Sequence, residues 1–144
     1  MSDKGIEKRL CQRFKIPGET ISYTRQKLLF SPKGFNEEFC PVLDISRGGV
    51  RFLTQKPLKF KATVVLQISI PGERIPLNLK GHIRWSSFNP GKSYKYQAGV
   101  QFHAYGEKKD QNYPGTLVKI IALEQKFIEP GEVDSPGNKS EFSI

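Results

Sequence analysis

The sequence has few of the residues that build metal and redox sites. Its 144 residues include two cysteines, Cys11 and Cys40, and two histidines, His82 and His103. The cysteines form no Cys-x-x-Cys pair, and neither has a histidine at the spacing of a zinc ligand. These missing patterns argue against a metal centre, and in a reducing compartment we expect both cysteines to be free thiols.

Long apolar runs are missing as well. No stretch approaches the length needed to cross a bilayer, and the first residues contain no apolar segment of the secretory type. We therefore expect a cytoplasmic protein. With 37% hydrophobic and 26% charged residues, the composition is that of one globular domain with a single hydrophobic core.

Motifs of the common enzyme classes are also absent. The sequence has no P-loop, no His-Glu-x-x-His and no Gly-x-Ser-x-Gly pattern. His82 and His103 fall on polar positions of alternating segments, without a nucleophile or a carboxylate at motif spacing. Exposed surface histidines explain them better than catalysis does, so we predict a protein that is not an enzyme and uses no cofactor.

Positive charge is what the chain has in excess. It contains 23 lysines and arginines against 14 acidic residues, a net charge of +9. Residues 129–144 carry a net charge of −3, so residues 1–128 carry +12. A basic surface of this size favours partners that bear phosphates, such as nucleic acid, a nucleotide or an anionic membrane, although it can also serve solubility alone.

Alternating apolar and polar residues predict an antiparallel β fold. The expected strands span residues 19–30, 39–45, 49–53, 62–70, 75–85 and 94–103. Turn signals separate them, which indicates a barrel or a sandwich. The alternation places Trp85, Tyr94 and Tyr96 on the core face.

A single helix is expected near the C-terminus. Pro114 suits its first turn, and Ile120 and Phe127 fall near helical spacing. Pro130 would end this helix, which we expect to cover an open end of the barrel. The acidic residues that follow, 129–144, read as a disordered tail.

The segment 42–52 predicts two strands joined by a polar turn that can hold an anion. The turn combines oxygen-bearing side chains, glycines and arginines: Asp44, Ser46, Arg47, Gly48, Gly49 and Arg51. The glycines bare backbone N–H groups, and the arginines add fixed charge and donors. Taken alone, an Asp-x-Ser-x-x-Gly turn is most simply a solvated hairpin turn.

A second motif precedes this turn and gives it context. Arg9 and Arg13 form an Arg-x-x-x-Arg pair that lies about thirty residues before Asp44. The two motifs together resemble the PilZ domain family of bacterial receptors for cyclic di-GMP. Residues 83–85 and 98–102 resemble the last two barrel strands of that family, so the resemblance covers roughly residues 7 to 127.

The resemblance implies a mostly β fold, a six-stranded antiparallel β-barrel with a C-terminal α-helix. It divides the chain into a flexible basic N-terminal arm at residues 1–15, a barrel with its helix at 16–128, and the tail at 129–144. It also implies a cyclic di-GMP receptor whose arm orders on binding and signals to a protein partner in motility, biofilm formation or virulence.

The resemblance also assigns roles to residues. Arg9 and Arg13 would hold phosphates and pair with or stack on guanine. Asp44 would accept from guanine N1–H and N2–H, Ser46 would bond the base edge, and Gly49 would admit the ligand close to the main chain. Further contributors would be Lys8, Arg47, Gly48, Arg51 and Gly99. Many family members have a doubled arginine where this sequence has Lys8-Arg9, and lysine lacks the bidentate fork of arginine.

Two alternatives stay open. One is a barrel that binds single-stranded nucleic acid through a basic face with stacked aromatic side chains. The core-facing positions predicted for Trp85, Tyr94 and Tyr96 speak against it. The other is an adaptor that has the PilZ fold but binds no nucleotide.

Overall fold

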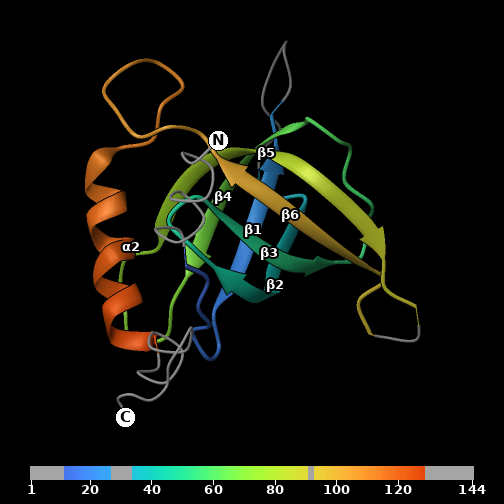
Figure 1. The fold of residues 1–144 in the computed structure, drawn as a ribbon. Coiled ribbons are helices and arrows are strands. Elements are labelled where there is room, and N and C mark those ends of the chain that lie inside the picture. The colour runs from blue at the N-terminus through green and yellow to red at the C-terminus, as the bar shows by residue number, and fades with distance from the viewer. Residues whose placement is uncertain (1–11, 27–33, 91–92, 129–144) are drawn as a thin grey trace, which may run out of the picture.

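Six strands close into an antiparallel barrel, and one helix of the described residues packs against one end of it, as the sequence predicted (Figure 1). The structure is a computed structural model that describes residues 12–26, 34–90 and 93–128. Its elements are β1 (Thr20–Arg25), β2 (Glu37–Ile45), β3 (Gly49–Thr54), β4 (Thr63–Ser69), β5 (Leu77–Phe88), β6 (Tyr96–Phe102) and α2 (Pro114–Phe127). Around the barrel the strands follow the order β1-β2-β3-β6-β5-β4. The expected fold class is confirmed.

Alternate residues of the strands fill the barrel interior. In β4 the inward-facing side chains are Val64, Leu66 and Ile68, all fully buried, as the sequence pattern predicted. Burial of each such side chain stabilises the fold by roughly 1.5–3 kcal/mol. Helix α2 buries Ile120 and Leu123 against the same core. No helix of the described residues is long and apolar enough to span a bilayer.

Several strand ends differ from the prediction. Strand β1 ends at Arg25, and residues 27–33 lie outside the described residues. Strand β5 begins after Pro76, which has no N–H to donate to a neighbouring strand, so Ile75 lies in the preceding turn and is 67% exposed. Strand β6 begins at Tyr96, two residues later than predicted.

A β-bulge in β2 decides which way Asp44 faces. Val42 pairs with Phe52, but the next pair is Asp44 with Arg51, so Leu43 is an extra residue. In a regular strand Asp44 would share the inward face of Val42, because side chains alternate with a period of two. The bulge places Asp44 on the outer face, beside Arg51.

A second bulge, between β5 and β6, overturns the prediction that Trp85 faces the core. Ile83 pairs with Val100 and Trp85 with Gly99, so Arg84 is the extra residue. Trp85 therefore turns outward and is 37% exposed. Tyr94 and Tyr96 were also predicted to face the core, and both are only half-buried.

The chain before β1 is attached to the barrel at Phe14. The N–H of Phe14 donates to Ile45 O, and the N–H of Ile45 donates to Phe14 O, both at 2.9 Å. The Phe14 side chain is 3% exposed. Residues 12–15, which we expected to belong to a flexible arm, thus lie along the end of β2. Lys8 and Arg9 lie outside the described residues.

Candidate ligand-binding site

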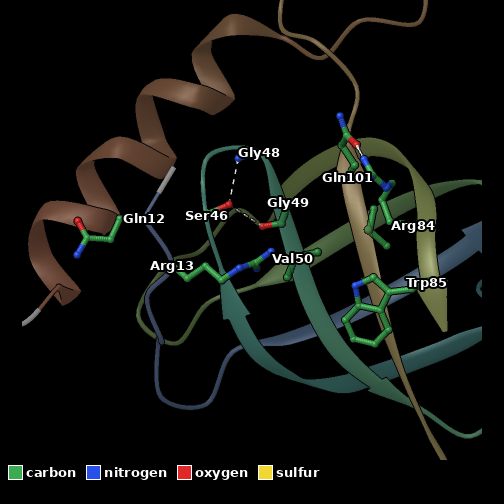
Figure 2. A pocket seen from close by; sticks show the side chains of 11 residues that line it. Gln12, Arg13, Ser46, Gly48, Gly49, Val50, Arg84, Trp85 and Gln101 are labelled. Atoms are coloured by element: carbon green, nitrogen blue, oxygen red, sulfur yellow. Dashed lines mark hydrogen bonds between the residues drawn. The ribbon is translucent and has the colours of Figure 1, made fainter. Parts of the chain in front are cut away.

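A pocket of about 690 Å³ opens on the outer face of β3, β6 and β5 (Figure 2). It is lined by Gln12, Arg13, Ser46, Gly48, Gly49, Val50, Arg84, Trp85, Gly99, Val100 and Gln101. The pocket thus joins the second arginine of the upstream motif to the turn between β2 and β3. Figure 2 shows Arg13 reaching from the N-terminal segment toward β3, with Trp85 and Arg84 beyond that strand.

Asp44 holds two arginines in place at this site. Its Oδ1 accepts from Arg13 Nη1 at 2.9 Å, and both carboxylate oxygens accept from Arg51. The Asp44 side chain is 8% exposed, whereas that of Arg13 is 51% exposed. Burial alone would raise the pKa of Asp44, but the hydrogen bonds and charges of Arg51 and Arg13 outweigh it and lower the pKa below its usual value.

Ser46 shapes the turn from within. Its hydroxyl accepts from the Gly48 N–H at 3.2 Å, and its own N–H donates to Gly49 O at 2.8 Å. Gly48 O in turn accepts from the N–H of Phe102, at 2.9 Å. These contacts fix the turn against β6, and they use the Gly48 N–H that the sequence suggested as a donor for a ligand.

Arg47, predicted as a further contributor to the site, is directed to helix α2 and is not among the residues that line the pocket. Its Nε donates to Oε1 of Glu124 in helix α2 at 2.8 Å. Its carbonyl oxygen accepts from the Tyr105 hydroxyl at 2.7 Å. Residues far apart in the sequence thereby tie the β2–β3 turn to the C-terminal helix.

Two of the glycines predicted at the site, Gly49 and Gly99, lie against neighbouring groups of the barrel. A Cβ on Gly49 would lie 2.4 Å from the carbonyl oxygen of Val100, so the absence of a side chain lets β3 approach β6. A Cβ on Gly99 would lie 2.3 Å from Nε1 of Trp85, so Gly99 makes room for the indole ring. Both line the pocket, but each is explained first by packing within the barrel.

Sequence reasoning missed six residues that line the pocket, namely Gln12, Val50, Arg84, Trp85, Val100 and Gln101. Arg84 donates to Oε1 of Gln101 across β5 and β6, and Trp85 lies beside that pair (Figure 2). Gln12 lines the edge and points away from Arg13 in this view. The β5 bulge decides that Arg84 and Trp85 both face outward, and an alternating sequence pattern carries no signal for that bulge.

The carboxyl group of Glu19 is buried near Asp44. Glu19 is 3% exposed, and neither of its side-chain oxygens has a hydrogen-bond partner. Burial, with a further contribution from the charge of Asp44, raises the pKa of Glu19 to about 8. Glu19 is therefore mostly protonated at neutral pH, and this group was not singled out from the sequence.

Other reactive groups of the described residues lie outside the pocket. Burial, together with the nearby Glu37, raises the pKa of Cys40 to about 12, which keeps this thiol protonated and unreactive. Within the described ranges no three histidine, cysteine or acidic side chains form a group that could hold a metal ion.

The site therefore combines features that suit a phosphate-bearing ligand with a planar base. Arg13 and Arg84 supply charged donors, and the Trp85 indole supplies a flat apolar surface. The turn from Ser46 to Gly49 borders the same space.

Comparison with known protein families agrees with the motifs of the sequence. A family model of the PilZ domain matches residues 7–118. No curated protein matches the sequence. A solved structure, that of the Bacillus subtilis inhibitor of motility (MotI/DgrA), is similar with a TM-score of 0.48 and 19% sequence identity, over 83% of this chain and 52% of that one. The chain thus spans about half the length of that solved chain. Since the family model covers most of the sequence, the chain belongs to the PilZ domain family.

Proposed function

We propose that the protein is a receptor for cyclic di-GMP and binds it in the pocket between the N-terminal segment and strands β3, β6 and β5. The family supports this proposal, since PilZ domains are receptor and adaptor domains rather than enzymes. The observation that carries it is the meeting of both motifs: Arg13 lies 2.9 Å from Asp44 and lines the same pocket as Ser46 and Gly49.

Arg13 is the residue that we expect to contact the ligand most directly. Its side chain is half-exposed, and it matches phosphate oxygens or the O6/N7 edge of guanine with two donors. The Asp44 carboxylate already accepts from three N–H groups, one of Arg13 and two of Arg51. It can accept from the N–H groups of guanine only after Arg13 has moved from Asp44 to the ligand. We therefore propose that Asp44 first positions Arg13 and accepts from the base once that bond has exchanged.

Other residues add to the same site. Trp85 and Arg84 would stack on and hold the second half of the dinucleotide. Arg9 and Lys8 keep their proposed roles from the sequence, although they lie outside the described residues. Arg51 would act through Asp44, which it holds.

A nucleic-acid function is the second candidate, and one observation favours it. Our sequence argument against it relied on core-facing aromatic side chains, and Trp85 instead lies on the outer face and lines the same pocket as Arg13 and Arg84. A binder of single-stranded nucleic acid uses several such stacking surfaces along a basic groove. Trp85 is the single aromatic residue that lines this pocket among the described residues.

Calorimetric titration of cyclic di-GMP, with Trp85 fluorescence as a second readout, tests the proposal. Trp85 is the only tryptophan of the sequence, so a change in emission reports on this pocket. We expect Arg13→Ala to weaken binding about 10–100-fold, the loss of one bidentate pair, and Arg13→Lys to lie between it and wild type. Arg74→Ala removes the same charge from an exposed turn and serves as the matched control.

The alternatives predict different results. Steeply salt-dependent binding of a single-stranded oligonucleotide, without binding of cyclic di-GMP, would establish the nucleic-acid function instead. Binding of neither ligand would leave an adaptor. The titration also gives the number of ligand molecules bound per protein. This number is of interest because this sequence has Lys8 where many family members have an arginine.

The output of the receptor is a further part of the proposal. We propose that binding reorganises the N-terminal segment and changes the surface offered to a protein partner in the cytoplasm, in motility, biofilm formation or virulence. Because Phe14 is already bonded to β2, such a change would concern the side chains of Gln12 and Arg13 and the residues before them.

A further inference from the structure

All exposed phenylalanines of the described residues lie at one end of the barrel. They are Phe35, Phe39, Phe60 and Phe88, with exposed fractions of 39%, 60%, 61% and 61%. The antiparallel order brings their segments together: the start of β2, the β3–β4 loop and the end of β5 share one end. In Figure 1 the arrowheads of β3 and β5 point away from helix α2, so this phenylalanine end lies opposite the helix.

Hydrogen bonds join the segments of the phenylalanine end into one surface. The Glu37 carboxylate accepts from the Gln55 N–H at 2.9 Å, and the Gln55 side chain donates to Ser93 O at 3.0 Å. The Leu58 N–H donates to Ser86 Oγ at 3.3 Å. The β3–β4 loop that carries Phe60 is thereby held between β2 and β5.

Basic residues are interspersed with these aromatic rings. Among the described residues, the exposed cations at this end are Arg25, Lys56, Lys59, Lys61 and Lys95. The acidic residues described there are Glu37, whose carboxylate is bonded inside the loop, and the exposed Glu38. In the loop the order is Lys59-Phe60-Lys61, and Lys61 Nζ lies 5.5 Å from the centre of the Phe60 ring.

We propose that the phenylalanine end docks on the surface of an anionic lipid bilayer. Lysines near a bilayer surface are attracted to anionic headgroups, and aromatic rings on exposed loops enter the interfacial layer below them. Charge and apolar area act together in this mode of binding. A protein partner would need a shaped cavity for each ring, whereas a fluid interface accepts rings that stand apart and alternate with lysines.

Docking through the phenylalanine end would leave the opposite end of the barrel exposed to solvent. The β2–β3 turn and helix α2 lie at the opposite end of the barrel, because β2 ends and β3 begins there. A docked molecule would present them away from the bilayer. The inference does not depend on the ligand of the pocket, so either can fail alone.

Vesicle co-sedimentation of the full chain tests the proposal. We expect binding to mixed phosphatidylglycerol–phosphatidylcholine vesicles, weaker at high salt, and little binding to pure phosphatidylcholine. The double variant Phe60→Ser/Phe88→Ser and the double variant Lys59→Gln/Lys61→Gln should each lose roughly tenfold in binding. Thermal unfolding checks that these exposed changes leave the fold intact.

Controls come from the opposite side of the barrel. Ile75→Ser removes an equally exposed apolar side chain, and Lys108→Gln/Lys109→Gln removes two exposed charges from the loop before α2. Both should bind as wild type. The proposal is overturned if wild type does not sediment, if the phenylalanine variant binds unchanged, or if the controls lose as much binding. It is also overturned if sedimentation velocity shows a dimer that the phenylalanine variant abolishes, since the end would then join two copies of the chain.

Discussion

At the residue scale, Glu19 places an unpaired carboxyl group inside the protein. In the unfolded chain it ionises near pH 4.5, whereas in the folded chain its pKa is about 8. Between these values the unfolded state releases a proton that the folded state keeps, so the free energy of unfolding falls as pH rises. The destabilisation caused by burying Glu19 is fully present above about pH 8 and absent below about pH 4.5.

Replacement of this group should flatten the pH dependence. We expect the free energy of unfolding of Glu19→Gln, relative to that of wild type, to be about 2–4 kcal/mol higher at pH 8 than at pH 5. Urea unfolding at the two pH values measures this difference. Asp44, whose pKa is lowered, titrates below both values and stays charged throughout. Parallel stability profiles of wild type and variant would show that Glu19 is ionised in the fold or finds a partner.

Gly49 and Gly99 should respond differently to the same substitution. In Gly49→Ala the new methyl group meets the backbone oxygen of Val100, which cannot move without separating β3 from β6. We expect a loss of about 2–4 kcal/mol in the free energy of unfolding, as for other clashes in packed interiors.

In Gly99→Ala the methyl group meets the Trp85 indole, a side chain that can rotate away. We expect a smaller loss of stability, below about 2 kcal/mol, with a shift in tryptophan emission and weaker ligand binding. Equal losses of stability with unchanged emission would contradict this assignment. Chemical unfolding and fluorescence spectra measure both quantities on the same samples.

At the scale of elements, helix α2 and the β2–β3 turn are joined by the ion pair of Arg47 and Glu124. The Glu124 side chain is 11% exposed, so Arg47→Ala leaves a mostly buried carboxylate without its partner. We expect a loss of about 1–3 kcal/mol, most of which disappears when Glu124→Leu is added. A double-mutant cycle from urea unfolding measures this coupling.

The same variant separates stability from binding. Arg47 points to the helix and not into the pocket, so Arg47→Ala should weaken cyclic di-GMP binding far less than Arg13→Ala does. A loss as large as that of Arg13→Ala would show either that Arg47 contacts the ligand or that helix α2 controls the pocket.

The elements themselves were largely predictable, but the faces of residues that follow a bulge were not. The alternation in β4 gave its inward residues, and Pro114 marked the start of α2. Two extra residues, Leu43 and Arg84, reverse the alternation and decide the outward positions of Asp44 and Trp85. Bulges arise from how two strands are paired, so a single strand's pattern does not reveal them.

At the scale of the whole molecule, a ligand that binds the folded chain alone must raise its stability. At a concentration of cyclic di-GMP about 100 times its dissociation constant, the gain is about 2.7 kcal/mol. For a chain of this size we expect the midpoint of thermal unfolding to rise by roughly 5–10 °C. Arg13→Ala at the same concentration should show a much smaller rise. A shift that persists in that variant would indicate another binding site.

The barrel and its family could be inferred from the sequence because two motifs in order, on a strand-rich background, are distinctive. The pocket was only half predictable. Arg13 and the turn residues Ser46, Gly48 and Gly49 belong to those motifs, but Arg84 comes from β5, which neither motif includes. The binding roles of these residues stay predictions.

The strand order also has a consequence for synthesis on the ribosome. Strand β3 pairs with β6, whose last residue is Phe102, so the barrel cannot close until that residue has left the exit tunnel. Until then β3 has an unpaired edge and apolar residues such as Phe52 lack their cover. A chain interrupted before β6 should therefore be a target for chaperones and proteases. A coding sequence truncated before β6 should yield no soluble product.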